Sequence, residues 1–156
     1  MSIPRIGVIL IYKRDVTNSS EDEYLTVYQD ASKLWGFPKG RWKKCEIYTE
    51  GACRELFEET GIKLSPDELS YKKMFHIKRG KHHHYYFVKH VYEKPVVFVD
   101  GYEITDYKWC SLNELSCKNV SYFTEQLIKK LYDDEFTRKN EVVRKPVFLD
   151  YKGVSV

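Results

Sequence analysis

The order of the predicted elements indicates an α/β fold in which a mixed β-sheet is sandwiched between helices. Strand-like segments come first, a helix interrupts them, further strands follow, and a second long helix lies near the end. This alternation in a chain of 156 residues is typical of one domain with helices on both faces of a sheet. We therefore expect a single domain over residues 1–156, with a C-terminal helix at about 121–139 and a tail at 140–156.

The predicted strands are short segments rich in β-branched and aromatic residues. Residues 5–13 are rich in Ile and Val, and residues 24–30 alternate between apolar and polar side chains. These two segments are expected to form a hairpin across the polar loop at 15–23. Further strands are predicted at 71–77, 85–93, 96–99 and 104–112.

The helices are indicated by helical spacing and by end signals. For residues 47–60, Ala52 and Leu56 recur at i, i+4, and Gly61 supplies a stop. Ser111 and Glu114 form a capping-box pair that starts a short helix. The last predicted helix has an apolar stripe at helical spacing, formed by Phe123, Leu127, Ile128, Leu131 and Tyr132. Packing in the core explains this stripe better than binding to the groove of a partner protein.

The charge distribution is more informative than the net charge of +3. Residues 71–92 contain six Lys or Arg, no acidic residue and all five histidines of the chain. Such a surface could attract an anion, such as a polyphosphate or a nucleic acid backbone. Alternatively, these residues are the solvated faces of strands and a loop tip. His82–His84 fit a loop tip better than a soft transition-metal site, because no acid accompanies them.

The cysteines and the N-terminal segment indicate in which cellular compartment the protein is expected. Cys45, Cys53, Cys110 and Cys117 show no CxxC spacing, which favours four reduced thiols over a zinc site or a disulfide framework. The apolar run at 6–12 is too short to span a membrane and lacks a signal-peptide cleavage site. We expect a cytoplasmic or nuclear protein without membrane association; the sequence does not indicate an oligomeric state.

An acidic face on the 47–60 helix is the strongest chemical signal. Glu55, Glu58 and Glu59 are spaced i, i+3, i+4, so their carboxylates project from one face and repel each other. Clustered carboxylates suit a hard divalent cation, which also takes phosphate oxygens and water. Taken alone, however, such a face is usually solvated surface.

A longer pattern surrounds this helix. It runs Gly40, five residues, Glu46, seven residues, Arg54-Glu55-Leu56, one residue, Glu58-Glu59, one residue, Gly61-Ile62. This resembles the Nudix box, GX5EX7REUXEEXGU with U aliphatic, at every defined position. Seven exact residues and two aliphatic positions at fixed spacing are far more specific than a short glycine motif.

The resemblance implies a Nudix fold and a role for each box residue. Glu55, Glu58 and Glu59 would bind Mg²⁺ or Mn²⁺, often with the carbonyl of Gly40. Arg54 would orient the carboxylates, and Glu46 would support them by pairing or through water. The implied chemistry is metal-dependent hydrolysis of a nucleoside diphosphate linked to another moiety.

Two flanking segments resemble the mRNA-decapping Nudix enzymes. "WGFPKGR" at 35–41 is similar to their box lead-in, and diadenosine tetraphosphate hydrolases carry a related Pro-Pro-Lys-Gly. Lys39 would face substrate phosphates in either group. "EITDYKWCSLNEL" at 103–115 is similar to the decapping segment whose glutamate is a metal ligand or general base, so Glu103 becomes a catalytic candidate. Plain scaffold is the alternative for this segment.

The expected substrate is therefore capped RNA, cleaved to 7-methylguanosine diphosphate and 5′-monophosphate RNA, as compact viral decapping proteins do. Alternatives are dinucleoside polyphosphates, nucleoside triphosphates and diphosphoinositol polyphosphates, or a non-catalytic binding module, which the complete set of carboxylates disfavours. Trp42 could pack or stack on a purine. The expected substrate contacts are Lys39, Arg41, Trp42, Lys78, Arg79 and Tyr86.

Overall fold

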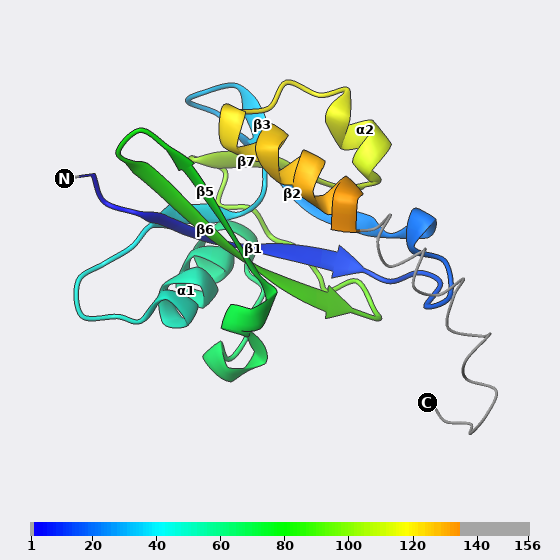
Figure 1. The fold of residues 1–156 in the computed structure, drawn as a ribbon, viewed down its shortest axis with the longest axis horizontal. Helices are drawn as coiled ribbons and strands as arrows, with labels where there is room; N and C mark the ends of the chain where they lie inside the picture. Colours follow the sequence, from blue (N-terminus) through cyan, green and yellow to red (C-terminus); the bar gives the residue numbers. More distant parts are fainter. Residues whose placement is uncertain (1, 135–156) are drawn as a thin grey trace.

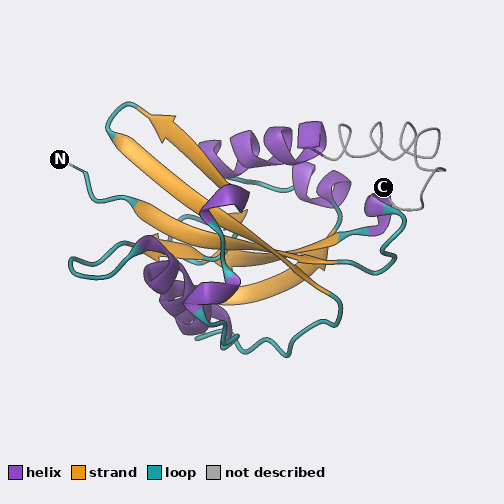
Figure 2. Ribbon diagram, turned by 60° about the horizontal axis from the view of Figure 1, so that its bottom comes forward, coloured by secondary structure: helices purple, strands orange, loops and turns teal. Residues whose placement is uncertain are grey.

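A seven-stranded mixed sheet with helices on both faces forms the centre of the molecule (Figures 1 and 2). We describe residues 2–134 of the computed structural model. Helix α1 (Tyr48–Thr60) covers one face, and α2 (Leu112–Ser116) with the helix of residues 122–134 covers the other. The predicted fold class is confirmed.

The strands and shorter turns have the following bounds. The strands are β1 (Arg5–Tyr12), β2 (Glu23–Gln29), β3 (Leu34–Gly36), β4 (Lys39–Arg41), β5 (Met74–Arg79), β6 (His82–Val91) and β7 (Ile104–Cys110). Three 3₁₀ turns lie at Ser19–Glu21, Pro66–Glu68 and Tyr71–Lys73.

Strand β1 organises the sheet. It pairs in parallel with β6 and antiparallel with β2, which confirms the predicted hairpin. The order is β3-β2-β1-β6-β5, with β7 added on β2 and β4 on β1. In the β1–β4 pair, Ile6 lies opposite Gly40. The glycine that opens the sequence motif is thereby fixed beside the first residues of the central strand.

Alternation along the strands divides the core into two layers. Ile6 and Leu10 of β1 pack on the same side as Ala52 and Leu56 of α1, all fully buried. Ile9 of β1 faces the opposite layer, where the described part of the last helix packs. The predicted stripe of that helix is confirmed as core for its buried members, Leu127, Ile128 and Leu131.

The strand predicted at 96–99 is wrong. Val97 is buried against the α1 layer, and the amide of Phe98 donates to the carbonyl of Thr60 at 2.8 Å. The segment therefore pairs with the end of α1 instead of with a strand. The first residues of the strand predicted at 71–77 also form a 3₁₀ turn, so β5 begins at Met74.

Two further boundaries differ from the prediction. Strands β3 and β4 lie in the segment expected to be loop, where three residues each are too few for a periodicity signal. His82–His84 belong to β6, because the turn is made by Gly80 at φ 61 and Lys81. Of the helix predicted at 121–139, residues 122–134 are confirmed; 135–139 and the tail lie outside the described residues.

The four cysteines are free thiols, as expected from their spacing. Within residues 2–134, no helix is both long enough and apolar enough to cross a bilayer.

Candidate active site

Helix α1 presents its carboxylates toward β4. The amide of Ile47 is satisfied by the Glu50 carboxylate at 3.0 Å, and Gly61 ends the helix in the left-handed conformation at φ 73. With Leu56 buried in the core, Glu55 projects across the backbone of Gly40. A Cβ on Gly40 would lie 2.1 Å from the Glu55 carboxyl, so only glycine allows this approach.

Arg54 is the hub of a carboxylate network. Its Nε and Nη2 donate to the two oxygens of Glu46 at 3.1 and 2.7 Å, and its Nη1 donates to Glu55 at 2.8 Å and Glu58 at 3.3 Å. Its Nη2 also donates to the carbonyl of Arg41 at 3.0 Å. These bonds, first of all those to Glu46, raise the pKa of Arg54 and lower that of Glu46. The network fixes three carboxylates between β4 and α1.

Glu59 lies deeper than the other carboxylates. It is 7% exposed, and one oxygen accepts the backbone amide of Lys39 at 3.1 Å. Burial raises the pKa of Glu59, with Glu55 and Glu103 adding to the rise, while Lys39 opposes it. Burial also lowers the pKa of Lys39, against the attraction of the same carboxylates. This pocket therefore holds charges that are incompletely solvated.

Glu103 joins the site from a different element, directly before β7. Its carboxylate is close enough to act on the charges of Lys39, Glu55 and Glu59. Its backbone carbonyl accepts the amide of Asp30 at 2.9 Å, which ties the segment to the end of β2. The side chain itself is exposed. Glu103 thus joins the part of α1 that carries Glu55 and Glu59.

The donor set fits a divalent cation that keeps part of its hydration shell. Within the described residues, no three His, Cys, Asp or Glu side chains converge as a closed cage. Mg²⁺ rarely uses such a cage, and commonly takes one or two carboxylates with water and phosphate oxygens. The space that a Cβ at Gly40 would fill is occupied by the Glu55 carboxylate, beside the strand backbone. Burial raises the pKa of Glu55, so a nearby cation would be favourable there.

A cavity of about 250 Å³ opens beside these residues. Lys39 and Glu59 line one wall. Sequence reasoning missed further lining residues, which come together from β1, β2, β6 and the last helix: Arg5, Gln29, His84, Phe123 and Thr124. Arg5 carried a usable signal, because it is a charged residue at the start of an otherwise apolar strand.

His84 and Phe123 form an uncharged wall of the cavity. Their rings are parallel, with centroids 3.5 Å apart, and Nδ1 of His84 lies 3.0 Å from the hydroxyl of Tyr86. Burial lowers the pKa of His84 to about 3, helped by the positive charges of Lys39 and Arg5. The imidazole is therefore neutral at physiological pH and adds no positive charge.

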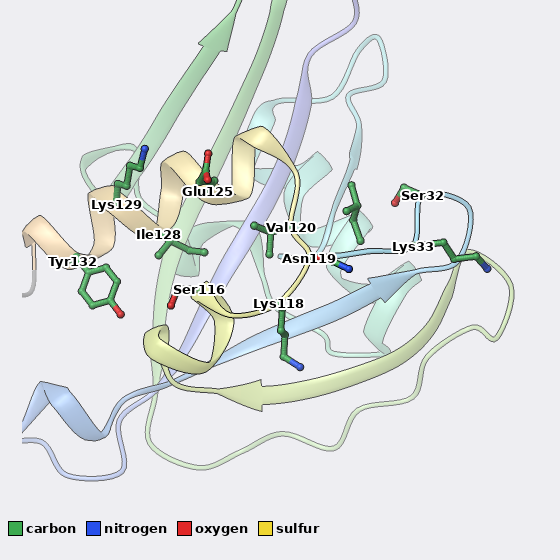
Figure 3. A pocket seen from close by; sticks show the side chains of 11 residues that line it. Ser32, Lys33, Ser116, Lys118, Asn119, Val120, Glu125, Ile128, Lys129 and Tyr132 are labelled. Atoms are coloured by element: carbon green, nitrogen blue, oxygen red, sulfur yellow. The ribbon is translucent and has the colours of Figure 1, made fainter.

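A wider groove of about 700 Å³ adjoins the cavity and shares Ser32 and Leu34 with it. We call it the lysine groove, because Lys33, Lys118 and Lys129 line it from three different segments (Figure 3). The ammonium of Lys118 lies 4.3 Å from the ring centroid of Trp35. Lys33 pairs with Asp30 at 3.2 Å and Glu125 also lines the groove, so a polyanion that enters the cavity meets further positive charge mainly from Lys118 and Lys129.

A sequence model of the NUDIX domain matches residues 4–142 of the chain. The chain belongs to the NUDIX family. A search of curated proteins finds no matching sequence.

Solved structures share the NUDIX fold with this chain. An Ap4A hydrolase from C. elegans, in a binary complex, is 18% identical with a TM-score of 0.66, over 85% of this chain and 96% of that one. The NUDIX domain of NrtR from Shewanella oneidensis, complexed with ADP ribose, is 15% identical with a TM-score of 0.68, over 86% and 88%.

A third NUDIX-like structure carries a metal. It is a bifunctional NMN adenylyltransferase/ADP ribose pyrophosphatase from Francisella tularensis, complexed with AMP and a Mn ion. It is 20% identical with a TM-score of 0.65, over 86% of this chain and 42% of that one. At these identities the similarity establishes the fold alone.

The NUDIX fold separates the side chains that were expected to contact substrate. Lys39 lines the cavity, and Arg41 is exposed at the end of β4. Trp42 and Lys78 line a third groove on the α1 side. Arg79 projects to the other side, where its guanidinium lies 4.4 Å from the ring centroid of Tyr122.

The expectation that Tyr86 contacts substrate is wrong. Its side chain is 1% exposed, packs against Phe37 in the core, and hydrogen bonds to His84. The strand alternation puts the adjacent Tyr85 on the opposite, partly exposed face.

Proposed function

We propose that the protein is a metal-dependent Nudix pyrophosphohydrolase of capped RNA, cleaving the triphosphate bridge to release 7-methylguanosine diphosphate and 5′-monophosphate RNA. One observation carries the choice of capped RNA. Glu103 directly precedes Ile104, which lines the cavity together with Lys39 and Glu59, and it stands where the resemblance to decapping enzymes places a metal ligand or general base.

The metal would be held by the carboxylates of α1 and by their neighbours on two other segments: Gly40, Glu55, Glu58, Glu59 and Glu103. When bound, Mg²⁺ or Mn²⁺ offsets phosphate charge and lowers the pKa of a coordinated water. The Mn ion in the Francisella structure supports a divalent metal in this fold. Arg54 positions the carboxylates through its hydrogen bonds to Glu46, Glu55 and Glu58.

The cavity residues of this chain supply positive charge and exclude water. Lys39 and Arg5 offer two cations to substrate phosphates on the wall next to Glu59. Phe37 and Phe123 provide apolar surface on the same cavity. Because charge interactions strengthen where water is excluded, the two cations stabilise phosphate charge more here than they would on an open surface.

A dinucleoside polyphosphate is the second candidate substrate. The similarity to the C. elegans Ap4A hydrolase spans nearly the whole of that protein. Lys39 also lies in a lead-in that resembles both groups. Such a substrate needs the same carboxylates and the same cations, so it differs from capped RNA in what lies beyond the polyphosphate.

The test is a parallel substrate panel with Mg²⁺ or Mn²⁺. The substrates are cap-labelled RNA, free cap dinucleotide, diadenosine tetraphosphate and diphosphoinositol pentakisphosphate. We expect labelled 7-methylguanosine diphosphate from RNA at the highest kcat/KM, and no product when EDTA is present. Faster turnover of diadenosine tetraphosphate or of the inositol substrate would refute RNA decapping.

Glu59→Gln is the matched control for the panel, because it keeps the side-chain shape and removes the charge. It should bind RNA but release no labelled product. If wild-type protein binds RNA and hydrolyses none of the substrates, the protein is a binding module instead of an enzyme.

A further inference from the structure

A third groove lies on the α1 side of the sheet, away from the lysine groove. Its volume is about 730 Å³, and its walls come from the N-terminal segment, the residue after β4, the start of α1 and the β5–β6 hairpin, whose tip projects from the sheet beside the N-terminus (Figure 1). We call it the aromatic groove. Six residues carry the argument: Trp42, Tyr48, Lys78, Lys81, His83 and Tyr85.

The aromatic side chains of this groove form a continuous, partly exposed ladder. Tyr85 and Tyr48 have ring centroids 4.9 Å apart, and Trp42 meets Tyr48 edge-on at 6.0 Å. On the other side Tyr85 stacks on His76 at 4.5 Å, with His83 next in the row. The indole N–H of Trp42 is already bonded to the carbonyl of Glu46, so its ring is held in place.

The charge of the groove favours an anion with neutral rings. Lys78 and Lys81 are both exposed, and among residues 2–134 no acidic side chain lines the groove. Burial, with the charges of His83 and Lys78, lowers the pKa of His76, which favours the neutral form of that ring. A positively charged base such as 7-methylguanine would be repelled by the two lysines. A neutral nucleobase with a phosphate on either side would find both a stacking surface and a cation.

The position of the groove relates it to the box carboxylates. Trp42 follows Gly40 by two residues, directly after the end of β4, which corresponds to about 7 Å of extended chain. The cavity lies on the other side of β4, at Lys39 and Glu59. The carboxylates therefore have the cavity on one side and the aromatic groove on the other, as a substrate with two parts joined by a polyphosphate requires.

We propose that the aromatic groove binds the nucleobases of single-stranded RNA, by stacking on Trp42 and Tyr85 while Lys78 and Lys81 contact the phosphates. The proposal rests on the proposed function for the identity of the strand, which would be the RNA part of the substrate. Binding to the groove needs neither metal nor hydrolysis, so it can be measured separately from activity.

The experiment is fluorescence anisotropy of a 3′-labelled, uncapped 12-nucleotide RNA in EDTA, with the protein of residues 1–156. We expect Lys78→Ala/Lys81→Ala to weaken binding about tenfold at low salt. Because two phosphate contacts are lost, the slope of the logarithm of the binding constant against the logarithm of the salt concentration should also become about 1.4 less steep. Lys72→Ala/Lys73→Ala removes the same charge from an exposed turn outside the groove, and should bind almost as wild type does. Equal losses in both variants would show unspecific attraction and overturn the proposal.

A second pair of variants tests stacking. Trp42→Leu should weaken binding roughly 5- to 160-fold, as expected for loss of one base–aromatic stack, whereas Trp42→Phe should retain most of the affinity. Where thermal melting shows that Trp42→Leu is unfolded, Tyr85→Leu takes its place, with Tyr85→Phe as the conservative partner. Equal affinity of the Leu and Phe variants would refute stacking.

The lysine groove provides the competing path for the strand. If Lys118→Ala/Lys129→Ala weakens binding more than Lys78→Ala/Lys81→Ala does, the RNA runs through the lysine groove and the proposal is wrong. If RNA binds in the aromatic groove but capped RNA is not hydrolysed with metal present, the proposed function fails while this inference stands.

Discussion

Glu46 and Glu59 belong to the same sequence motif, yet their carboxylates lie in opposite electrostatic environments. Glu46 receives two hydrogen bonds from Arg54, and these lower its pKa. Glu59 is buried against Lys39, and burial raises its pKa. The first carboxylate is neutralised within the protein, while the charge of the second is poorly compensated.

Because of this difference, we expect Glu46 to position the site and Glu59 to act as a metal ligand. The pairing of Glu46 with Arg54 holds the loop after β4 on α1, and it leaves no oxygen of Glu46 that needs an outside cation. Glu59 and Glu55 lose solvation on folding, which a bound cation would offset. Substitutions at the two positions should therefore change different quantities, stability at Glu46 and turnover at Glu59.

The largest effect is expected for Glu59→Gln. Loss of a ligand charge should lower kcat for capped RNA by at least about 10²- to 10³-fold. The free energy of unfolding without metal should change little, because burial already raises the pKa of Glu59 to about 8 and Gln keeps the shape of the protonated carboxyl. Glu50→Gln, an acid in the first turn of the same helix, should retain turnover. Wild-type turnover in Glu59→Gln would remove Glu59 from the metal site.

Gly40→Ala is expected to have the next largest effect. The added methyl would meet the Glu55 carboxyl at 2.1 Å, so Glu55 or β4 must move and kcat should fall about 10- to 100-fold. Overpacking should also destabilise the protein by about 1–3 kcal/mol. Gly80→Ala has backbone strain at φ 61 but no atom within 4 Å, so it should lose stability without a steric clash. Unchanged turnover in Gly40→Ala would contradict the close approach.

Glu46→Gln should affect stability more than turnover. Losing the charged partner of Arg54 should cost about 1.5–3 kcal/mol near pH 7, with less than about tenfold change in kcat. Because the folded-state pKa of Glu46 lies below its ordinary value of 4.5, its contribution is complete above that value. It is lost as pH falls through the lowered pKa. Urea unfolding at about pH 7 and pH 3.5 should show the difference from wild type shrinking; a constant difference would argue against this ion pair.

For His84 the expected effect is on the pH dependence of stability, and no effect of its titration is expected near neutral pH. Its folded-state pKa of about 3 lies below the ordinary 6.5, so between these values the unfolded chain binds more protons. Stability should therefore fall with falling pH in that window, by at most about 1.4 kcal/mol per pH unit from this group. His84→Phe loses the hydrogen bond to Tyr86 at every pH, which lowers the free energy of unfolding by a constant amount. The slope of the free energy of unfolding against pH is therefore the quantity to compare between the variant and the wild type. An equal slope in the variant would show that His84 is not responsible.

The parts of the site that are local in sequence could be predicted from it. The bounds of α1 differ from the prediction by one residue at its start, and the carboxylates follow from the spacing of the motif. Arg5, His84 and Phe123 come together through pairing of distant strands and helix packing, which no local pattern encodes. The misassignment of Tyr86 has a related cause. A shift of one residue reverses every side chain of a strand, and the register of β6 is set by β1.

Long sequence separation also limited the fold prediction. Strands β3 and β4 have three residues each, which is too short to show a strand periodicity. They are stabilised by pairing, β3 with β2 and β4 with β1. Residues 96–99 have the composition of a strand but find their partner at the end of α1, in the Phe98–Thr60 hydrogen bond. Composition could indicate that this segment is buried, but not what it would pair with.

The parallel pairing of β1 with β6 has a consequence for synthesis of the protein. Arg5 pairs with His84, so the central strand waits for a partner made about 80 residues later. At roughly 5–20 residues per second, this delay on the ribosome is about 4 to 16 s. During that time the apolar β1 has an unsatisfied edge, which makes the nascent chain prone to aggregation and a natural client for chaperones.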